Sequence, residues 1–519
     1  MPNVADLGLV PQPARVSLGE GRIRLSDASE VLRRIDTALP AEGYVLDVGV
    51  GGVRLRAGGT AGLFYGEQTL LQLLPPERLS SPTLARALAR GPVDLPVVRI
   101  EDEPAYPWRG FMLDVARHFF PVGFILRMID QLAAHKLNVL HLHLTDDQGW
   151  RIPIPGYPRL TEVGGWRAGT VIGFDSPHGD SGHDDHVHDE RPHGGAYTRA
   201  DLERIVAYAA ERHIRVLPEV DFPGHVGAAI AAYPELGNGA MPDVRTRWGI
   251  SQHILNLEDS TLRFVQAVLD EVMDIFPGAY VHGGGDEVPK REWRESAAVQ
   301  RRRIELGIAD EEELQGWFTA QIDRMIRTRG RRLVAWDEVV TGGAPKDTLV
   351  MAWRTSGYGV NAALQGYDVV MSPSEYVYLD HRQSTNPDEP VTFPDSPLPL
   401  ARVFEFEPVP EELRAAYGTP GCGRVLGGQV HLWSEYVPNE RHAEYMTFPR
   451  LCAFAEAVWR APLAPGGYRD FPDFHRRVSS HMARLRAAGM SYREFDTSSA
   501  FLELEQVPPE RRPLLTGGR

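Results

Sequence analysis

Residues 138–151 read NVLHLHLTDDQGWR, and this stretch decides the fold. A short apolar run with the length of a buried strand ends there in polar residues. Seven similar runs occur elsewhere in the chain, at residues 110–115, 214–220, 280–284, 332–336, 349–353, 368–371 and 425–432. Helical patterns lie between or after these runs and are clearest at residues 124–135, 199–212, 261–276, 312–329 and 442–460. Eight strands joined by helical crossovers predict an α/β fold, a (β/α)8 TIM barrel whose active site lies on the loops after the strand C-termini.

The first hundred residues have a different pattern. Short alternating segments at residues 44–48 and 52–55 predict strands, and residues 62–74 predict a helix, as in a small α+β domain. The sequence EDEPAYP at residues 101–107 marks a boundary, because charges and prolines interrupt regular structure. We therefore expect an N-terminal domain at residues 1–105, the barrel at residues 106–465, and a C-terminal helix and tail, packed on the barrel, at residues 466–519.

Composition limits the class of partner. The 519 residues carry a formal net charge of -15, whereas nucleic acid and anionic membranes need a concentrated basic surface. We expect a small-molecule partner, with no nucleic acid and no membrane. The N-terminal residues have no basic segment followed by an apolar run, and no stretch of about 18 apolar residues occurs. This predicts a cytoplasmic location, with a secreted protein whose leader has been trimmed as the alternative.

Polar and aromatic residues gather where the predicted strands end. In strand order they are Asp114 and Arg117; His143, Asp146 and Asp147; Glu219, Asp221 and His225; His282, Asp286 and Glu287; Trp336, Asp337 and Glu338; Trp353; Tyr378 and Asp380; and Trp433 and Glu435. In a barrel all of them converge on one rim. Carboxylates and an arginine can bind sugar hydroxyls, indole rings can pack on a sugar face, and a carboxylic acid can protonate a glycosidic oxygen. This rim therefore predicts a glycoside hydrolase.

A set of segments in fixed order strengthens this interpretation. They are RGFMLDVARHFFP (109–121), NVLHLHLTDDQGWR (138–151), LPEVDFPGH (217–225), HGGGDEV (282–288), AWDEV (335–339), YLD (378–380) and GGQVHLWSE (427–435). Together they resemble the β-N-acetylhexosaminidases of glycoside hydrolase family 20. The N-terminal segments PQP (11–13) and GLFYGEQTLLQLL (62–74) look like the non-catalytic α+β domain of that family.

The resemblance implies exo-acting, retaining hydrolysis of terminal non-reducing β-linked N-acetyl-D-hexosamine, with N-acetylglucosaminides as substrates and N-acetylgalactosaminides as a second possibility. In that mechanism the substrate's own acetamido group attacks and forms an oxazolinium, so no enzyme nucleophile, metal or cofactor is needed. Glu287 would be the general acid, and Asp286 would orient and stabilise the acetamido group. The other implied contacts are Tyr378 to the acetamido carbonyl, Trp336, Trp353 and Trp433 as pocket walls, Arg117, Asp146 and Glu435 to the outer hydroxyls, His225 beside Glu287, and Asp380 at the acetamido end.

The sequence departs from the family in two places. Many members have another tryptophan soon after the YLD segment, but none occurs here before Phe404, so the leaving-group side is either more open or lined by a residue such as Phe393. The connection at residues 173–195 is rich in histidine, with His178, His183, His186, His188 and His193. Metal binding is one interpretation of it. A solvated loop is the favoured one, because the spacing matches no known metal site.

Two other classes of function compete. His141 and His143 at a strand end, with His225 and His282 on later strands, have the residue types of a metal-dependent amidohydrolase barrel. In that class, however, the paired histidines usually follow the first strand, whereas here they lie on the second. The other alternative is a carbohydrate-binding barrel without catalysis. A pure binding protein has no reason to keep Asp286, Glu287 and Tyr378 together.

Overall fold

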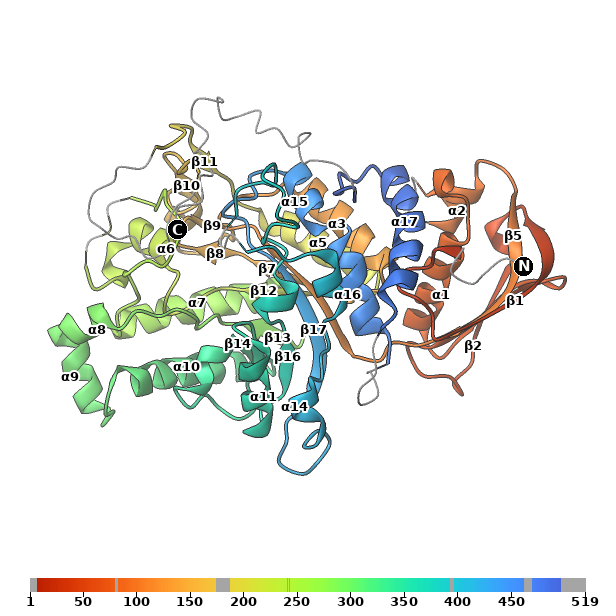
Figure 1. Cartoon of the computed structure of the whole chain (residues 1–519). Coiled ribbons are helices and arrows are strands. Elements are labelled where there is room, and N and C mark those ends of the chain that lie inside the picture. Colours follow the sequence, from red (N-terminus) through yellow and green to blue (C-terminus); the bar gives the residue numbers. More distant parts are fainter. Residues whose placement is uncertain are drawn as a thin grey trace.

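The computed structural model describes residues 7–79, 83–173, 187–239, 241, 243–392, 396–461 and 469–495. A small sheet domain lies on one side of a larger barrel, and the C-terminal helix α17 (Phe471–Ala487) runs between them (Figure 1). None of the helices in these ranges is long and apolar enough to cross a membrane.

Eight parallel strands close the barrel in chain order, and the last pairs with the first. They are β6 (Trp108–Asp114), β7 (Val139–His143), β12 (Arg215–Glu219), β13 (Tyr280–His282), β14 (Arg332–Trp336), β15 (Leu349–Ala352), β16 (Val369–Met371) and β17 (Val425–Leu432). Each expected strand begins and ends within two residues of the observed one. The predicted TIM barrel is therefore confirmed.

The helices follow the expected order with two differences. The longer ones are α3 (Val122–Ala134), α5 (Arg199–Ala210), α7 (Asp259–Ile275), α9 (Ala297–Glu305), α10 (Glu311–Arg327), α11 (Ser356–Leu364), α15 (Glu440–Thr447) and α16 (Arg450–Trp459). The shorter ones are α4 (Arg159–Glu162), α6 (Gly227–Ala232), α8 (Arg291–Glu295), α12 (Ser374–Val377), α13 (Leu400–Phe404) and α14 (Glu411–Arg414). Residues 442–460, expected as one helix, form two, because Pro449 at the break has no amide hydrogen to donate. The crossover from β14 to β15 contains only the 3-10 turn η5 (Asp337–Val340).

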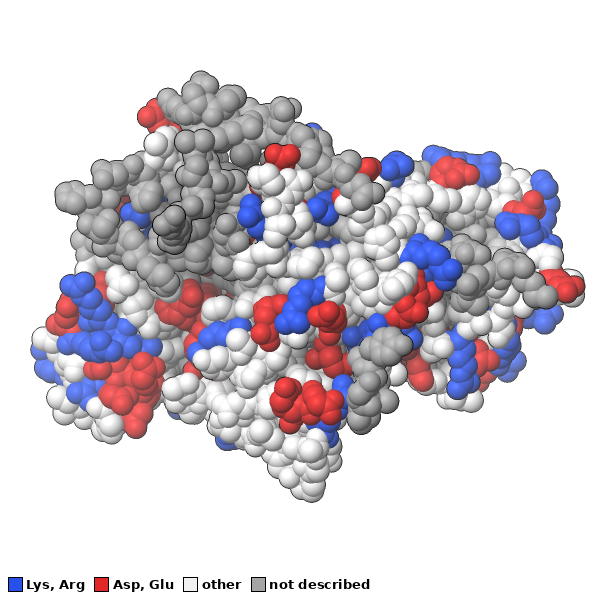
Figure 2. Space-filling view, viewed as in Figure 1, with Lys and Arg blue, Asp and Glu red and all other residues white. Residues whose placement is uncertain are grey.

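The surface mixes charges of both signs. On the face seen in Figure 2, basic and acidic side chains lie beside one another over α8 and α9 and over the sheet domain. Charges therefore offset one another locally on this face, although the whole chain has a net charge of -15.

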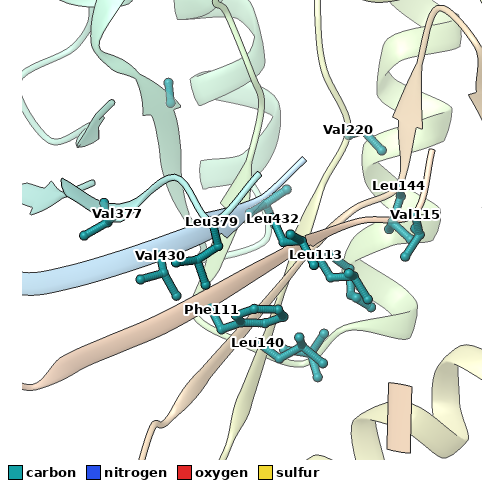
Figure 3. Close-up of a cluster of buried hydrophobic side chains, with 14 of the residues drawn as sticks. Phe111, Leu113, Val115, Leu140, Leu144, Val220, Val377, Leu379, Val430 and Leu432 are labelled. Atoms are coloured by element: carbon teal, nitrogen blue, oxygen red, sulfur yellow. The ribbon is translucent and has the colours of Figure 1, made fainter. Parts of the chain in front are cut away.

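Strand alternation divides the barrel residues into an inner and an outer set. In β7, Leu140 and Leu142 belong to the layer between the strands and the helices, while Val139 belongs to a separate apolar cluster inside the barrel. Phe111, Leu113, Leu140, Val430 and Leu432 can be followed in Figure 3 as part of the outer layer. Since side chains alternate along a strand, His141 and His143 point inward with Val139. The barrel therefore encloses ionisable groups as well as apolar ones.

The N-terminal domain is a five-stranded sheet in the order β1-β5-β3-β4-β2, with helices on its barrel side (Figure 1). Its elements are β1 (Arg15–Leu25), β2 (Val31–Ile35), β3 (Tyr44–Gly49), β4 (Gly52–Ala57), α1 (Thr60–Gln72), α2 (Leu84–Leu88) and β5 (Val93–Asp102). Trp459, from the end of barrel helix α16, is part of this domain's apolar core. The two domains therefore share a packed interface.

A buried carboxylate joins the two domains. Asp102 at the end of β5 accepts hydrogen bonds from Lys136 Nζ at 2.8 Å, from the Tyr44 hydroxyl at 2.7 Å and from Trp459 Nε1 at 2.9 Å. Lys136 and Trp459 come from the barrel, and Tyr44 comes from the sheet. Because these groups are buried, Lys136 and Trp459 of the barrel need the carboxylate that the sheet domain supplies.

A second buried carboxylate fixes the C-terminal helix. Glu456 on α16 accepts a two-pronged ion pair from Arg477 on α17, with distances of 2.6 and 3.1 Å. Its Oε2 also accepts the backbone N–H of Gln12 at 2.8 Å, and Arg477 donates to the Leu9 carbonyl at 3.0 Å. Both charged side chains are almost fully buried. One ion pair thus ties the N-terminal segment, the barrel and α17 together.

We predict that Arg477→Met will lower the free energy of unfolding by about 3–5 kcal/mol, because it leaves the Glu456 carboxylate buried without its partner. The matched control is Arg476→Met on the same helix, where the side chain is 49% exposed and pairs only with Asp473. That change should cost about 1 kcal/mol or less. Urea denaturation of both variants measures the difference. Equal losses would contradict a stabilising role for the buried pair.

Candidate active site

A cavity of about 390 Å³ opens at the carboxyl ends of the barrel strands. The predicted site residues that line it are Arg117, His225, Asp286, Glu287, Trp336, Trp353, Tyr378, Asp380, Trp433 and Glu435. Asp146 does not line the cavity. It lies behind Arg117, with its Oδ2 2.9 Å from Arg117 Nη2. The sequence therefore placed these residues at one site, and Asp146 acts there through another side chain.

Aromatic rings form one side of the cavity. Trp353 and Tyr378 are stacked with ring centres 6.1 Å apart, and Trp433 lies 6.4 Å from Tyr378 and 6.0 Å from Trp336. Rings packed against one another in stacked and tilted arrangements leave little freedom to rotate, so this wall has a fixed shape. Such a pocket suits a small group with an apolar part, for example the methyl of an acetamido group.

The Trp336 ring is held from below by Glu219 at the end of β12. Trp336 Nε1 donates to Glu219 Oε1 at 2.8 Å, and His282 Nδ1 lies 3.1 Å from the same oxygen. The other oxygen, Oε2, lies 2.6 Å from His143 Nδ1 and 3.0 Å from His141 Nε2. Burial opposes the charge of Glu219, but the neighbouring histidines hold its pKa well below its usual range. A fixed negative charge therefore lies under the aromatic wall.

Trp353 is anchored by the two acids after β14. Its backbone N–H donates to Asp337 Oδ2 at 2.8 Å, and its Nε1 donates to Glu338 Oε2 at 3.0 Å. Burial, followed by the adjacent Asp337, raises the pKa of Glu338 to about 8. These contacts orient the ring, so the acids of the AWDEV segment support the wall of the cavity.

The carboxyl of Asp286 lies beside a second carboxyl group. Ligand atoms of Asp221, His225 and Asp286 lie within 4.8 Å of one another. Burial raises the pKa of Asp221 to about 8. Burial and the Asp221 carboxylate raise the pKa of Asp286 well above its usual range. Because two close carboxylates in a buried site repel one another, this pair shares a proton near neutral pH.

His225 connects this pair to the rest of the site. Its Nδ1 is 3.2 Å from Asp146 Oδ1, while its Nε2 is 3.6 Å from Asp286 Oδ2 and 3.5 Å from Glu287 Oε2. Burial opposes protonation, but Asp146 and Asp286 raise the pKa of His225 well above its usual value. A cationic imidazole therefore faces both carboxyl groups of the Asp286-Glu287 pair.

The loop after β13 brings Asp286 and Glu287 into position through unusual backbone angles. Gly284 has φ +66°, Gly285 has φ +99°, and Glu287, which is not glycine, has φ +46°. A Cβ on Gly284 would lie 1.7 Å from Asp221 Oδ1, and the Gly285 N–H donates to that same oxygen at 2.9 Å. Positive φ at a residue other than glycine is strained and is common at functional sites. Glycine at position 284 is therefore required for the carboxyl pair to form.

A cluster of charged groups that includes Arg117, Asp380 and Glu435 also lines the cavity. Arg117 contacts Asp114 at 3.3 Å and Glu435 at 3.9 Å, in addition to Asp146. These acids outweigh the effect of burial and raise the pKa of Arg117 further above its usual value. Burial, then the charge of Glu435, raises the pKa of Asp380 well above its usual range. Asp380 therefore lies near Glu435, and its charge also acts on Tyr378.

Several lining residues were not predicted. Trp248, Gly249, Ile250 and Tyr436 contribute to the cavity, as do Ser374 and His381. Trp248 to Ile250 come from the long connection after β12, which has no strand end to mark it. The nearest signal was the tryptophan itself, beside a glycine in a polar segment. Asp221 was noted only as a residue at a strand end, and the structure places it against Asp286.

Two predictions on the loops stay untested. Phe393, and His178, His183 and His186 of the histidine-rich connection, lie outside the described residues. Of the other histidines, His188 Nε2 is 3.0 Å from Thr246 Oγ1, and His193 Nε2 accepts the backbone N–H of Phe119 at 3.0 Å. These two side chains thus hold the C-terminal end of the connection to neighbouring loops.

Metal-ligand residue types also converge inside the barrel. Among the described residues, close groups form from His141, Glu219 and His282, from Asp146, Asp147 and His225, and from Asp221, His225 and Asp286. The amidohydrolase interpretation named His141 and His282 of the first group, together with His143 and His225. Both oxygens of Glu219 already have histidine or tryptophan partners at 2.6–3.1 Å. The group therefore serves as a hydrogen-bonded floor under Trp336.

Two family models match the chain. The model described as glycosyl hydrolase family 20, catalytic domain, matches residues 106–462, and the one described as glycosyl hydrolase family 20, domain 2, matches residues 12–103. The first covers the barrel with its cavity, and the second covers the N-terminal sheet.

Curated relatives and solved structures agree with these matches. A β-hexosaminidase of Porphyromonas gingivalis is 42% identical over 465 residues, which are 88% of this chain and 56% of that protein. A β-hexosaminidase of Akkermansia muciniphila is 34% identical over 489 residues, which are 92% of this chain and 90% of that protein. The structure of an exo β-N-acetylglucosaminidase from Vibrio harveyi in complex with N-acetylglucosamine has a TM-score of 0.81 and 31% identity, covering 94% of this chain and 78% of that one. The chain thus spans little more than half of the first relative.

We predict that Gly284→Ala will lower the free energy of unfolding by about 2–5 kcal/mol, since the left-handed strain of an L-residue adds to the clash with Asp221. Gly330→Ala is the matched control: Gly330 has nearly the same backbone angle, φ +69°, with nothing within 4 Å of its Cβ position. It should lose only the strain, about 1–2 kcal/mol. Chemical denaturation compares the two. If both variants lose the same amount, the close approach of Asp221 does not constrain this loop.

Proposed function

The chain belongs to glycosyl hydrolase family 20, and from this premise we propose that it removes terminal, non-reducing β-linked N-acetyl-D-hexosamine from glycosides by exo-acting, retaining hydrolysis. The observation that carries the proposal is the placement of Asp286 and Glu287 at the mouth of a cavity walled by Trp336, Trp353 and Trp433. An acid and a second carboxyl group beside an aromatic pocket suit a sugar with an acetamido substituent.

The first step uses the substrate's own acetamido group. Its carbonyl oxygen attacks the anomeric carbon as the bond from that carbon to the leaving oxygen breaks, and Glu287 transfers its proton to the leaving oxygen. The product of this step is a bound oxazolinium. Tyr378, at the aromatic wall, is placed to donate to the acetamido oxygen. Holding the nucleophile within the same molecule lowers the barrier because no second reactant has to be brought in and oriented.

The second step reverses the first with water. Glu287, now a carboxylate, takes a proton from water while the water oxygen attacks the anomeric carbon. The bond from that carbon to the acetamido oxygen breaks, which restores the acetamido group and leaves Glu287 protonated. Since each step inverts the anomeric carbon, the product keeps the β configuration.

Asp286 has to accept the acetamido N–H and stabilise the positive charge of the oxazolinium. The shared proton therefore has to reside on Asp221 when substrate is bound, which leaves Asp286 as the acceptor. The cationic His225, 3.5 Å from Glu287 Oε2, stabilises the carboxylate that Glu287 becomes after it gives up its proton. In this proposal Asp221 is the proton store of the site.

The charged residues around Arg117 support action on chain ends. Arg117 and Glu435 face the cavity, with Asp146 behind Arg117 fixing its guanidinium. We assign them to the outer hydroxyls of a single sugar, since charge-assisted hydrogen bonds fix orientation. Asp380 lines the same cavity as Tyr378, and we assign it to the acetamido end. We further propose that the only partners are small carbohydrates, and not nucleic acid.

We predict that turnover will require the acetamido group. An aryl β-N-acetylglucosaminide should be hydrolysed, while the matching aryl β-glucoside should be slower by at least about 10⁵-fold, which is the effective molarity that a well-placed internal nucleophile supplies. A chromogenic assay with both substrates measures the ratio. Comparable rates, or a trapped covalent bond between sugar and enzyme, would show that this mechanism is wrong.

We predict that Glu287→Gln will lower kcat/KM about 10²–10⁴-fold for a glycoside with a poor leaving group, since such a group needs protonation as it departs. With an activated aryl leaving group the loss should be much smaller. Glu295→Gln, at a side chain that is 64% exposed, is the control and should leave both rates unchanged. Losses of the same size on both substrates would remove Glu287 from the role of general acid.

A further inference from the structure

A second cluster of reactive side chains lies outside the active-site cavity, at the joint of three helices. His135 follows the last residue of α3, Cys452 lies on α16, and His481 lies on α17. All three side chains are buried. None of them lines the active-site cavity, and the proposed hydrolysis uses none of them. The chain therefore buries a thiol and two imidazoles together for a reason other than that reaction.

Three potential ligand atoms face one another in this cluster. His135 Nε2 is 3.0 Å from His481 Nε2 and 3.3 Å from Cys452 Sγ, and the three atoms lie within 4.8 Å of one another. Zn–N bonds of about 2.0–2.1 Å and a Zn–S bond of about 2.3 Å, at tetrahedral angles, put such atoms about 3.3–3.6 Å apart. The two observed separations are thus within a few tenths of an ångström of a tetrahedral metal site.

The tautomer of His135 is fixed in the form that binds a metal. Its Nδ1 lies 2.7 Å from the Gln131 carbonyl, which can only accept, so Nδ1 carries the hydrogen. Nε2 is therefore a lone pair aimed at Cys452 and His481. Histidines that ligate metals commonly donate their other N–H to a backbone carbonyl in this way.

Without a metal, the cluster leaves a buried group unsatisfied. If His481 Nε2–H donates to His135, then His481 Nδ1 is a buried lone pair with no partner among the described residues. If Cys452 donates to His135 instead, the Nε2 lone pairs of the two imidazoles face each other at 3.0 Å. A metal ion accepts the lone pairs of Cys452 Sγ and of both Nε2 atoms at once, while the Nδ1–H of His481 stays without a partner among the described residues.

We propose that His135, Cys452 and His481 bind one divalent transition metal ion, zinc by its preference for thiolate and imidazole ligands, in a site separate from the active site.

A neighbouring cavity supplies the fourth ligand position and the entry path. His135 and His481 line a space of about 280 Å³ between α1, α3 and α17, together with polar groups that include Gln72, Asp130 and Arg484. A water molecule in this space completes a tetrahedral site. Burial, together with the positive charges of Arg484 and Arg477, lowers the pKa of His481. Arg477 is paired with Glu456, and Arg484 donates to the Leu7, Gly8 and Gln72 carbonyls. The Cys452 thiolate supplies the negative charge that offsets the ion.

The position of the site indicates a structural role. Its ligands connect two barrel helices to α17, which also holds the N-terminal segment through Arg477 and Arg484. An ion that binds the folded chain and not the unfolded one stabilises it by mass action. Bound zinc would therefore secure the C-terminal helix to the barrel.

Cobalt(II) tests the proposal on the full-length protein, reduced with a thiol-free reductant. Binding to Cys452 should give one thiolate-to-cobalt charge-transfer band per chain in the near ultraviolet, with tetrahedral d–d bands in the visible. The carboxylate and histidine groups of the active site have no thiolate, so they cannot produce the charge-transfer band. Cys452→Ser should abolish the band, while Cys422→Ser, which removes the other cysteine of the chain, should keep it.

Zinc should also raise the thermal midpoint of the wild type by at least about 3 °C, and Cys452→Ser or His481→Gln should remove this shift. Hydrolysis of an activated aryl glycoside at low temperature should persist after dialysis against a chelator, which separates this site from the proposed reaction. A thiol assay after unfolding first shows that both cysteines of the wild-type protein react. If that protein gives no charge-transfer band with cobalt(II), the proposal is overturned without any variant. Retention of the band in Cys452→Ser would do the same.

Discussion

The active site depends on one buried carboxylate, Glu219. A lone ion inside a barrel is unfavourable, so its two oxygens need partners: Trp336 and His143 hydrogen-bond to them, and the imidazoles of His141 and His282 lie 3.0 and 3.1 Å away. The constraint spreads outward from there. His143, which contacts Glu219, also lies 2.9 Å from Asp146, and Asp146 in turn contacts Arg117 and His225. The aromatic wall, the sugar-binding end and the imidazole beside the catalytic pair are therefore ordered by a single chain of charge-assisted contacts.

The loop after β13 carries Asp286 and Glu287 into the site. There the positions of the acids depend on a strained backbone, and not on a network of hydrogen bonds like that around Glu219. Glu287 has a left-handed φ, and Gly284 leaves no room for a side chain against Asp221. Both features hold acidic groups close together in a buried site, where burial, followed by the charge of Asp221, raises the pKa of Asp286. Stability given up at this loop is recovered elsewhere, in the apolar layer between strands and helices and in buried ion pairs such as Glu456 with Arg477.

The sequence predicted the barrel well because apolar runs such as VLHLH are short, and the polar residues that end them mark the rim. It predicted the residues at strand ends for the same reason. It did not predict the break at Pro449, where helical spacing continues across the proline. Trp248 was missed because it lies in a loop, and the pairing of Asp221 with Asp286 was missed because contacts between loops of different strands leave no local pattern. The cluster of His135, Cys452 and His481 joins three segments that only the folded chain brings together.

Asp102 links the two segments that the family models match separately. The family models divide the chain between residues 103 and 106, yet Lys136 and Trp459 of the barrel both depend on a carboxylate that lies before that division. A gene fragment that encoded only the barrel would expose to water the surface around Lys136 and Trp459 that the sheet domain covers, and would remove the carboxylate to which both side chains donate. The boundary between the matched segments therefore runs through a shared buried interface, and a change of one domain requires new partners for Lys136 and Trp459.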